Sequence, residues 1–180
     1  KNRAESAGAV VSTERFPVFL PDLVVRSRRT VLTSGARPAA LHIRQGKIIG
    51  VMDFDDVPAG CPLDDAADAV LMPGAVDTHV HVNEPGPTEW ERFETATRAA
   101  AAGGVTTIVD VSASTTAGAL VQKHKAAGGK RFVDVGFWGG IVPGNVAELE
   151  PLAAAGVRGF KCALAPSSVD GFPAVTESEL

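Results

Sequence analysis

Short apolar runs separated by polar and turn residues fill the first part of the chain, up to about residue 72. Four of these runs have the length and side chains of β-strands, at 23–25, 30–32, 40–44 and 47–52. The last two are joined across Gln45-Gly46, and a short connection with glycine between two apolar runs is typical of a β-hairpin. The acidic, proline-containing stretch at 53–68 predicts a loop. We therefore expect a small β-rich segment over residues 1–72.

After Met72-Pro73-Gly74 the pattern changes to strands that alternate with helices. Four apolar strands are predicted at 75–82, 105–111, 132–137 and 157–162. Three helices are predicted between them: from a capping box at Thr88 and Glu91 to Gly103-Gly104, at 117–127, and from Asn145 to Gly156. The strands begin 29, 27 and 25 residues apart, counted from residues 76, 105, 132 and 157, and this spacing is typical of βαβ units in a parallel sheet.

This second part predicts an α/β fold, the first half of a (β/α)8 TIM barrel, over residues 73–180. A closed barrel takes about 250 residues. Only 106 residues follow Gly74 (180 − 74), which leaves room for four of the eight strands. A second capping box at Thr176 and Glu179 predicts the start of another helix where the chain ends. We therefore expect a truncated barrel; the alternative is a complete, small, open α/β sheet.

The composition narrows the class of protein. The 180 residues carry 17 basic and 21 acidic side chains, and 45% are hydrophobic, a balance that suits a packed core and not a disordered or nucleic-acid-binding protein. No apolar run approaches the roughly 20 residues of a membrane span, and the polar N-terminus predicts no secretory signal. Two cysteines, Cys61 and Cys162, are too few for a disulfide scaffold. A reducing compartment is expected, the cytoplasm first and an organelle such as the peroxisome as the alternative.

The strongest candidate for chemistry is Asp77-Thr78-His79-Val80-His81, at the end of the first parallel strand. Side chains alternate faces along a strand, so His79 and His81 are expected to point the same way, at the carboxyl edge where barrel active sites lie. Two imidazoles so placed suit a divalent metal ion; the alternative is a pair of hydrogen-bonded histidines at a strand end. Asp77 alternates onto the same face, either to orient an imidazole or as a polar group at the base of the loop.

Lys161 is a lone cation in the apolar run Gly159-Phe160-Lys161-Cys162-Ala163-Leu164. Lysine is rarely buried without a partner, and desolvation favours its neutral, nucleophilic amine. Such an amine can add carbon dioxide and become a carbamate, an anion able to bridge two metals. The alternative is a lysine whose amine reaches solvent.

Longer motifs surround these residues and carry a resemblance to a known family. They lie at 72–86, 88–91, 93–97, 103–107, 133–140, 143–145, 156–157 and 159–162. With them the chain resembles the cyclic amidohydrolases, and within that family the allantoinase group, over most of residues 69–180. The N-terminal β-rich segment is compatible with the small sandwich of that family.

The resemblance implies a hydrolase with two divalent metal ions, usually Zn2+, on a (β/α)8 barrel. His79 and His81 would bind one metal, and Lys161, as N6-carboxylysine, would bridge both. Two further histidines and the catalytic aspartate are expected beyond residue 180, while His42 and His124 are expected to be ordinary surface residues. A hydroxide held between the metals would attack the ring carbonyl, converting allantoin to allantoate. The full-length protein is expected to be a homo-oligomer, and these 180 residues alone to be inactive.

Asn83 bears on the choice of substrate. It stands where the related dihydroorotases tend to carry an arginine that pairs with a substrate carboxylate. Allantoin has no carboxylate, so Asn83 is a candidate for neutral hydrogen bonds to this cyclic ureide; the alternative is that it only caps its loop. The segment 111–116 after Asp110 departs from the family pattern.

Two other interpretations remain open. One is a hydantoinase or dihydropyrimidinase, against which Asn83 and Trp138-Gly139-Gly140 argue. The other is a non-catalytic relative that keeps the barrel and assembles with partners, against which the retained metal-site candidates argue.

Overall fold

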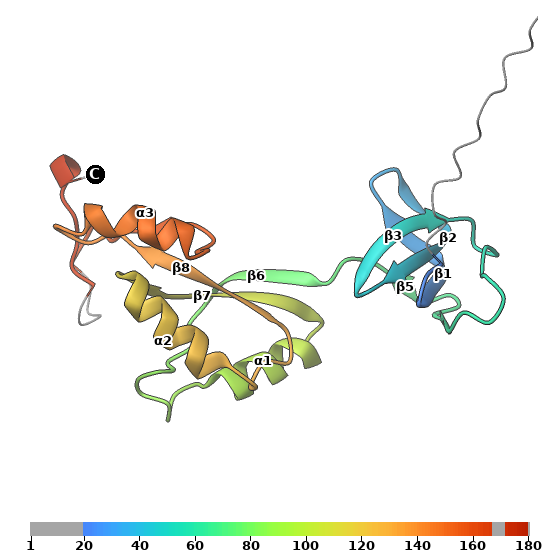
Figure 1. Cartoon of the computed structure of the whole chain (residues 1–180), viewed down its shortest axis with the longest axis horizontal. Helices are drawn as coiled ribbons and strands as arrows, with labels where there is room; N and C mark the ends of the chain where they lie inside the picture. Colours follow the sequence, from blue (N-terminus) through green and yellow to red (C-terminus); the bar gives the residue numbers. More distant parts are fainter. Residues whose placement is uncertain (1–19, 167–171, 180) are drawn as a thin grey trace, which may run out of the picture. The chain divides into compact units, whose positions relative to one another are not determined.

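The computed structural model describes residues 20–166 and 172–179. The chain divides into two compact units, one ending at Pro73 and the other beginning at Gly74 (Figure 1). This division falls where the sequence pattern changes from short β-runs to alternating strands and helices.

The first unit is one five-stranded sheet. Its strands are β1 (Leu23–Leu32), β2 (Gly35–Arg44), β3 (Lys47–Met52), β4 (Leu63–Asp65) and β5 (Val70–Leu71). The order is β3-β2-β1-β4, with β5 also paired to β1; β1, β2 and β3 are antiparallel neighbours, whereas β4 and β5 run parallel to β1. The predicted hairpin between β2 and β3 is confirmed, since Gln45 and Gly46 have the positive φ angles (51° and 71°) that a tight two-residue turn requires.

Two expectations for this unit are wrong. The runs at 23–25 and 30–32 belong to one strand, β1, whose pairing with β2 shifts between Ser27 and Thr30. Ser27 is buried at this irregularity. Its hydroxyl donates to the carbonyl of Ala69 (2.6 Å) and accepts from the N–H of Arg29 (2.9 Å), so the strand continues through polar residues. The stretch at 53–68 contains β4, which is three exposed residues long and therefore too short for a hydrophobic period to reveal it.

The second unit is a parallel sheet with helices between its strands. Its elements are β6 (Ala75–Val80), α1 (Phe93–Ala102), β7 (Val105–Ser114), α2 (Ala117–Ala127), β8 (Asp134–Gly140), α3 (Val146–Ala154) and β9 (Phe160–Lys161), followed by a 3-10 turn at Glu177–Glu179. The strands lie in the order β6-β7-β8-β9, and all pairs are parallel. The predicted alternation of strand and helix is confirmed, with β6 and β9 at the two edges. None of the described helices is long and apolar enough to span a membrane.

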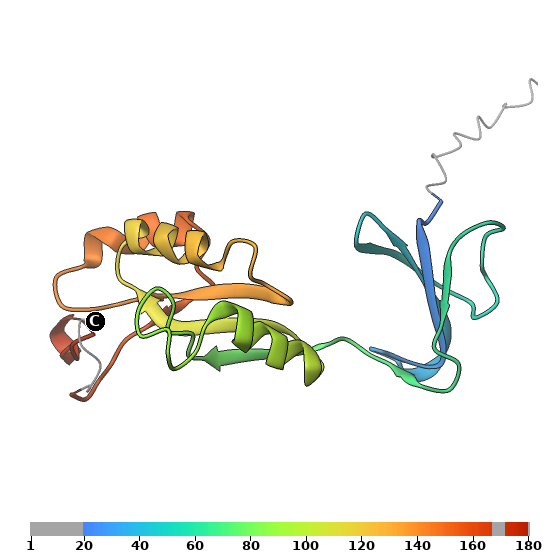
Figure 2. The ribbon, with the colours of Figure 1, turned by 90° about the horizontal axis from the view of Figure 1, so that it is seen from below.

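One hydrophobic core, here called the helix-side core, joins the helices to this sheet. Its buried members come from all three helices, from β7 and β8, and from the residue two positions after β6: Val82, Phe93, Ala96, Ile108, Leu120, Ala127, Phe137 and Leu152. Val80 and Phe160 pack against it, so the helices cover one face of the sheet, and the neighbouring residues on each strand point to the opposite face. This face is here called the open face, although Val109 and Val111 of β7 are buried. Figure 2 shows α2 and α3 side by side above β8.

Helix α1 begins at Phe93, later than the Thr88 capping box predicts. Residues 88–90 form a turn, and Arg92 is the N-cap residue. Glu91 caps the helix from outside its first turn, because its carboxylate accepts hydrogen bonds from the N–H of Arg92 (3.0 Å) and from the hydroxyl of Thr95. The C-terminal end of α1 and both ends of α2 agree with the sequence pattern.

The observed ends of several strands differ from the ends predicted from the apolar runs, because pairing with the neighbouring strand determines where a strand ends. Strand β7 continues to Ser114, which pairs with Gly139, three residues beyond the predicted strand end at residue 111. Strand β8 accordingly spans Asp134–Gly140 and not 132–137. Strand β9 is limited to the two residues that pair with β8.

Candidate metal site

The two histidines at the end of β6 lie on the open face of the sheet. They flank Val80, which packs against the helix-side core. His81 lies between Val80 and Val82, which both contact that core, so its imidazole points away from the core, and the imidazole of His79 lies beside it. Their ring centroids are 5.7 Å apart with the planes inclined by 57°, and both residues are exposed. Rings this close can each turn a nitrogen toward a common ion.

Asp77 holds the backbone at the first of these histidines. Its carboxylate accepts a hydrogen bond from the N–H of His79 (3.0 Å). The pairing of β6 with β7 is irregular here, because Asp77 is aligned with Ile108 and Val80 with Asp110, so that three steps along β6 match two along β7. An extra residue interrupts the regular alternation of side chains along a strand. Counting residues along β6 therefore does not show that Asp77 lies on the same face as the imidazoles. The contact observed for Asp77 is with the backbone of His79.

Lys161 also points to the open face, at the other edge of the sheet. It lies in β9 opposite Gly140, and its neighbour Phe160 packs against the helix-side core. The lysine is half-buried, and its Nζ lies 5.8 Å from the ring centroid of Phe172, within cation–π range. Among the residues that the structure describes, no carboxylate forms an ion pair with it. Strands β7 and β8 separate Lys161 from the histidines.

These three side chains fit part of a metal centre. Imidazole nitrogens are ordinary zinc ligands, and a carbamate on Lys161 would add carboxylate-like oxygens. Within 20–166 and 172–179, no three His, Cys, Asp or Glu side chains gather closely enough to hold an ion. A zinc ion takes four ligands, so a two-metal centre needs more ligands than two imidazoles and one carbamate offer.

A buried ion pair on the helix side of the same strands is not revealed by the sequence pattern. Asp110 of β7 is fully buried, and the Nζ of Lys123 from α2 donates to its Oδ2. The other carboxylate oxygen accepts the N–H groups of Ser112 (2.9 Å) and Val82 (3.2 Å). The signal available in the sequence was an acidic residue inside the apolar run 105–111, which is rare without a partner.

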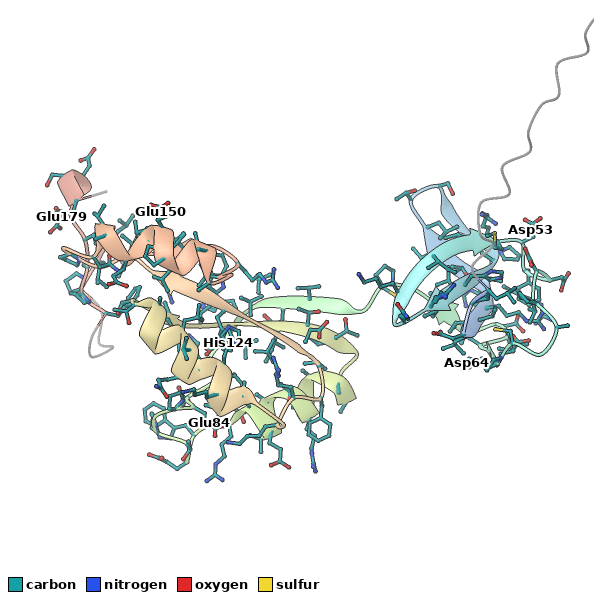
Figure 3. All side chains as sticks on the ribbon, in the orientation of Figure 1. Asp53, Asp64, Glu84, His124, Glu150 and Glu179 are labelled. Carbon is teal, nitrogen blue, oxygen red and sulfur yellow. The ribbon has the colours of Figure 1, made fainter. Side chains whose placement is uncertain are left out.

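A second ion pair holds the segment between β6 and α1. Glu84, labelled in Figure 3, is buried. Its Oε1 accepts from the Nζ of Lys130 and its Oε2 from the N–H of Phe93 (3.1 Å). Burial alone would raise the pKa of Glu84, but these hydrogen bonds outweigh it and hold the pKa below its ordinary value of 4.5. Asn83 lies in the same segment, half-buried, and its side chain has no hydrogen bond with any described residue.

Glu84→Gln is expected to lower the free energy of unfolding by about 1–2 kcal/mol at pH 7, because the amide loses the charge that binds Lys130 and the start of α1. Because the pKa of Glu84 is lowered in the folded state, its carboxylate stabilises the fold above the unfolded pKa of about 4.5. This contribution is lost as the pH falls through the lower, folded value. Urea unfolding between pH 7 and pH 3 should therefore show the gap between wild type and variant shrinking below about pH 4.5.

The control for this experiment is Glu94→Gln, which removes an exposed partner of Arg98 on α1. Exposed pairs of this kind contribute little, and the expected change is under about 0.5 kcal/mol. A gap between wild type and Glu84→Gln that stays the same at pH 3 would contradict the role given to the carboxylate.

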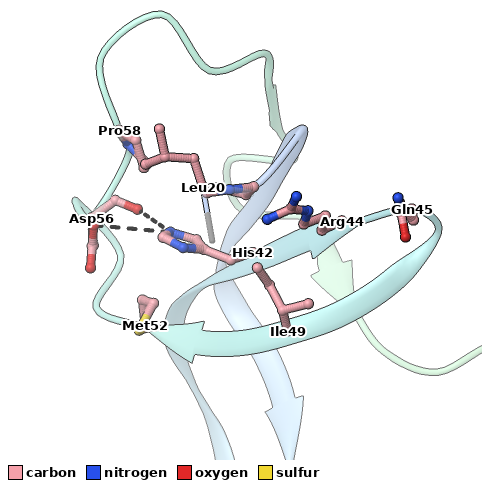
Figure 4. A pocket seen from close by; sticks show the side chains of 9 residues that line it. Leu20, His42, Arg44, Gln45, Ile49, Met52, Asp56 and Pro58 are labelled. Atoms are coloured by element: carbon pink, nitrogen blue, oxygen red, sulfur yellow. Dashed lines mark hydrogen bonds and ion pairs between the residues drawn. The ribbon is translucent and has the colours of Figure 1, made fainter. Parts of the chain in front are cut away.

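Of the two histidines expected on the surface, only His124 is exposed. His124 is labelled in Figure 3, and its ring lies edge-on to that of Phe137, with the centroids 4.7 Å apart. The expectation for His42 is wrong: it is buried, and its Nε2 lies 2.8 Å from the carbonyl oxygen of Asp56 (Figure 4). The reason is that β2 is an inner strand between β1 and β3, and the loop after β3 brings Asp56 to the ring of His42.

Comparisons with known proteins point to one family. Residues 70–175 match the amidohydrolase family. The chain is 53% identical to the allantoinase of Streptomyces avermitilis over 165 residues, which cover 88% of this chain and 37% of that protein. It is 49% identical to the allantoinase of Saccharomyces cerevisiae over 171 residues, which cover 87% of this chain and 37% of that protein.

A solved structure shares the fold. The L-hydantoinase (dihydropyrimidinase) from Arthrobacter aurescens matches with a TM-score of 0.77 and 36% identity, over 89% of this chain and 37% of that one. This likeness confirms the predicted fold class, a β-rich segment followed by part of a barrel. The chain spans a little over a third of the length of these relatives.

Proposed function

Because the chain belongs to the amidohydrolase family, we propose that it supplies part of the active site of a hydrolase that opens a cyclic amide, with allantoin as substrate and allantoate as product. The observation that carries the proposal is the histidine pair of β6 and the lysine of β9 on one open face of a parallel sheet. Barrel active sites lie at the carboxyl ends of such strands.

The proposed cofactors are two divalent cations, expected to be zinc. His79 and His81 would hold one of them, and Lys161, as N6-carboxylysine, would bridge both. To form the carbamate, the neutral amine of Lys161 attacks the carbon of CO2, a N–C bond forms, and one proton leaves. When bound, the cations supply Lewis-acid polarisation of the ring carbonyl and a nucleophile at neutral pH. Asp77 supports this site from outside by holding the backbone of His79.

The proposed substrate follows from the relatives and from one side chain. Both curated relatives described above are allantoinases. Asn83 lies just beyond the histidine pair and offers a neutral amide, which can donate to and accept from a ureide ring. The hydantoinase structure supports a second candidate, hydrolysis of hydantoin or dihydropyrimidine rings.

The test is an assay of the complete gene product, freed of metal and then reconstituted with zinc. We expect zinc-dependent hydrolysis of allantoin, with kcat/KM at least about 100-fold above those for hydantoin and dihydrouracil. The 180-residue chain alone is the control. We expect it to be inactive, because its metal ligands are incomplete and both edges of its sheet are open.

Each result bears on a different part of the proposal. A preference for hydantoin would assign the second candidate activity. Failure to hydrolyse any of the three rings after zinc uptake would contradict the enzymatic proposal and favour an assembly protein. Zinc-dependent hydrolysis by the 180-residue chain would contradict the incomplete site. We further propose a homo-oligomer in the cytoplasm or an organelle such as the peroxisome, to be checked by light scattering and cell fractionation.

A further inference from the structure

A tryptophan from a distant strand holds the backbone immediately before His79. The indole Nε1–H of Trp138, on β8, donates to the carbonyl of Thr78 (2.9 Å), whose peptide bond leads into His79. Strand β7 lies between β6 and β8, so the indole reaches across it. The neighbouring Phe137 is part of the helix-side core, which puts Trp138 on the open face with the two imidazoles.

The same indole rests against the chain that leads into Lys161. A Cβ at Gly159 would lie 2.6 Å from the Cζ3 atom of Trp138, so only glycine leaves room for the ring here. Trp138 therefore contacts both sides of the candidate metal site. It reaches one side by a hydrogen bond to the backbone and the other by packing on a glycine.

The end of β6 needs such support because its pairing is irregular. The register with β7 shifts between Asp77 and Val80, so the regular ladder does not by itself determine where the next side chains point. On the far side of the histidine pair, the N–H of Val82 donates to Asp110 (3.2 Å), and the hydroxyl of Ser112 donates to the carbonyl of Val82 (3.3 Å). Side-chain bonds thus hold the backbone on both sides of the two histidines.

We propose that Trp138 is a positioning residue for the metal site, and that it orients His79 relative to Lys161 through the carbonyl of Thr78. This rests on the proposed function, because it takes His79 and Lys161 as ligands of divalent cations. Groups that orient metal ligands from outside typically change metal affinity by about 10–100-fold when they are removed.

The test compares Trp138→Phe with Trp90→Phe in the metal-free complete gene product. Trp138→Phe removes the indole N–H and keeps an aromatic ring. Trp90→Phe makes the same chemical change at a residue that is 76% exposed. Titration with zinc against a chromophoric chelator is expected to show about 10-fold weaker binding or more for Trp138→Phe, and wild-type affinity for Trp90→Phe. The urea midpoints of the two metal-free variants are expected to agree.

A second variant and a second measurement protect the test against misfolding. Gly159→Ala pushes on the indole from the other side and is expected to weaken zinc binding as well. In 15N NMR spectra of the metal-free protein, the two variants assign the indole N–H signals of Trp138 and Trp90. The N–H of Trp138 is expected to exchange with water more slowly than that of Trp90.

Equal zinc affinities of Trp138→Phe and Trp90→Phe would overturn the proposal. A loss of affinity matched by a lower urea midpoint in Trp138→Phe would also overturn it, since that result indicates a merely structural role. A wild type that binds zinc more tightly than Trp138→Phe but hydrolyses no cyclic amide would support the positioning role and refute the proposed function. If the wild type hydrolyses allantoin but Trp138→Phe binds zinc as tightly as the wild type, the proposed function is supported and the positioning role of Trp138 is refuted.

Discussion

Lys161→Ala is expected to lower kcat/KM for allantoin by about 1,000-fold or more in the complete gene product. Alanine can neither form a carbamate nor bridge two cations. Lewis-acid polarisation of a carbonyl is worth several kcal/mol, and about 4 kcal/mol corresponds to about 1,000-fold in rate. Steady-state hydrolysis of allantoin measures the loss, and elemental analysis of zinc per chain shows whether the metal is lost with it.

One further variant tests whether Lys161 acts as a carbamate or as a positive charge, and a second lysine variant is the control. Arginine at 161 keeps a charge, but its guanidinium stays protonated and does not add CO2, so Lys161→Arg is expected to be as inactive as Lys161→Ala. Lys125 is exposed on α2, and Lys125→Ala is expected to leave the activity unchanged. Removing bicarbonate during zinc reconstitution is expected to lower the zinc content of the wild type and of Lys125→Ala, and to leave that of the two Lys161 variants unchanged. An active Lys161→Arg variant would contradict the carbamate.

Lys123→Met is expected to reduce the free energy of unfolding by about 3–5 kcal/mol, because it leaves the carboxylate of Asp110 buried without its cation. Asp110 is 0% exposed and the side chain of Lys123 only 11%, so water cannot readily replace the lost ammonium group. Urea unfolding of the metal-free protein measures this effect without any contribution from bound zinc.

The same ion pair offers a double-mutant cycle. In Asp110→Asn the amide oxygen can still accept the N–H groups of Val82 and Ser112, and no buried charge remains. The double variant Asp110→Asn/Lys123→Met is therefore expected to be more stable than Lys123→Met alone. Lys125→Met, on the exposed side of α2, is the control, with an expected change under about 0.5 kcal/mol. A loss below about 1 kcal/mol in Lys123→Met would contradict a strongly coupled buried pair.

Local patterns predicted the element types of the second unit, but not all of their ends. Helix α2 has the predicted bounds, because its Thr116 cap and its glycine stop lie next to it in the sequence. Helix α1 begins later than its Thr88 signal predicts, and its first N–H, that of Phe93, donates to Glu84 in a segment outside the helix. Strand β7 is longer than its apolar run, because its last residues are held by pairing with β8. An end that depends on a neighbouring element has no local signal.

The histidine pair is the part of the candidate site that follows most directly from the residues. His79 and His81 are two residues apart in the sequence, and their ring centroids lie 5.7 Å apart in the structure. Counting residues does not determine the face of Asp77, because the irregular pairing of β6 with β7 inserts a step that the sequence of one strand does not reveal. The burial of His42 likewise depends on the strands and the loop around it.

Periodicity, glycine stops and the spacing of apolar runs were thus sufficient for the α/β class and for the first two candidate ligands, since each of these is a short-range property of the polypeptide. The contacts of Trp138 with Thr78 and of Lys123 with Asp110 emerged only from the folded arrangement. Their partners lie on different strands and helices, and their meeting depends on strand order, register and burial. Residue type and spacing along one chain do not specify those quantities, because they arise from packing between elements.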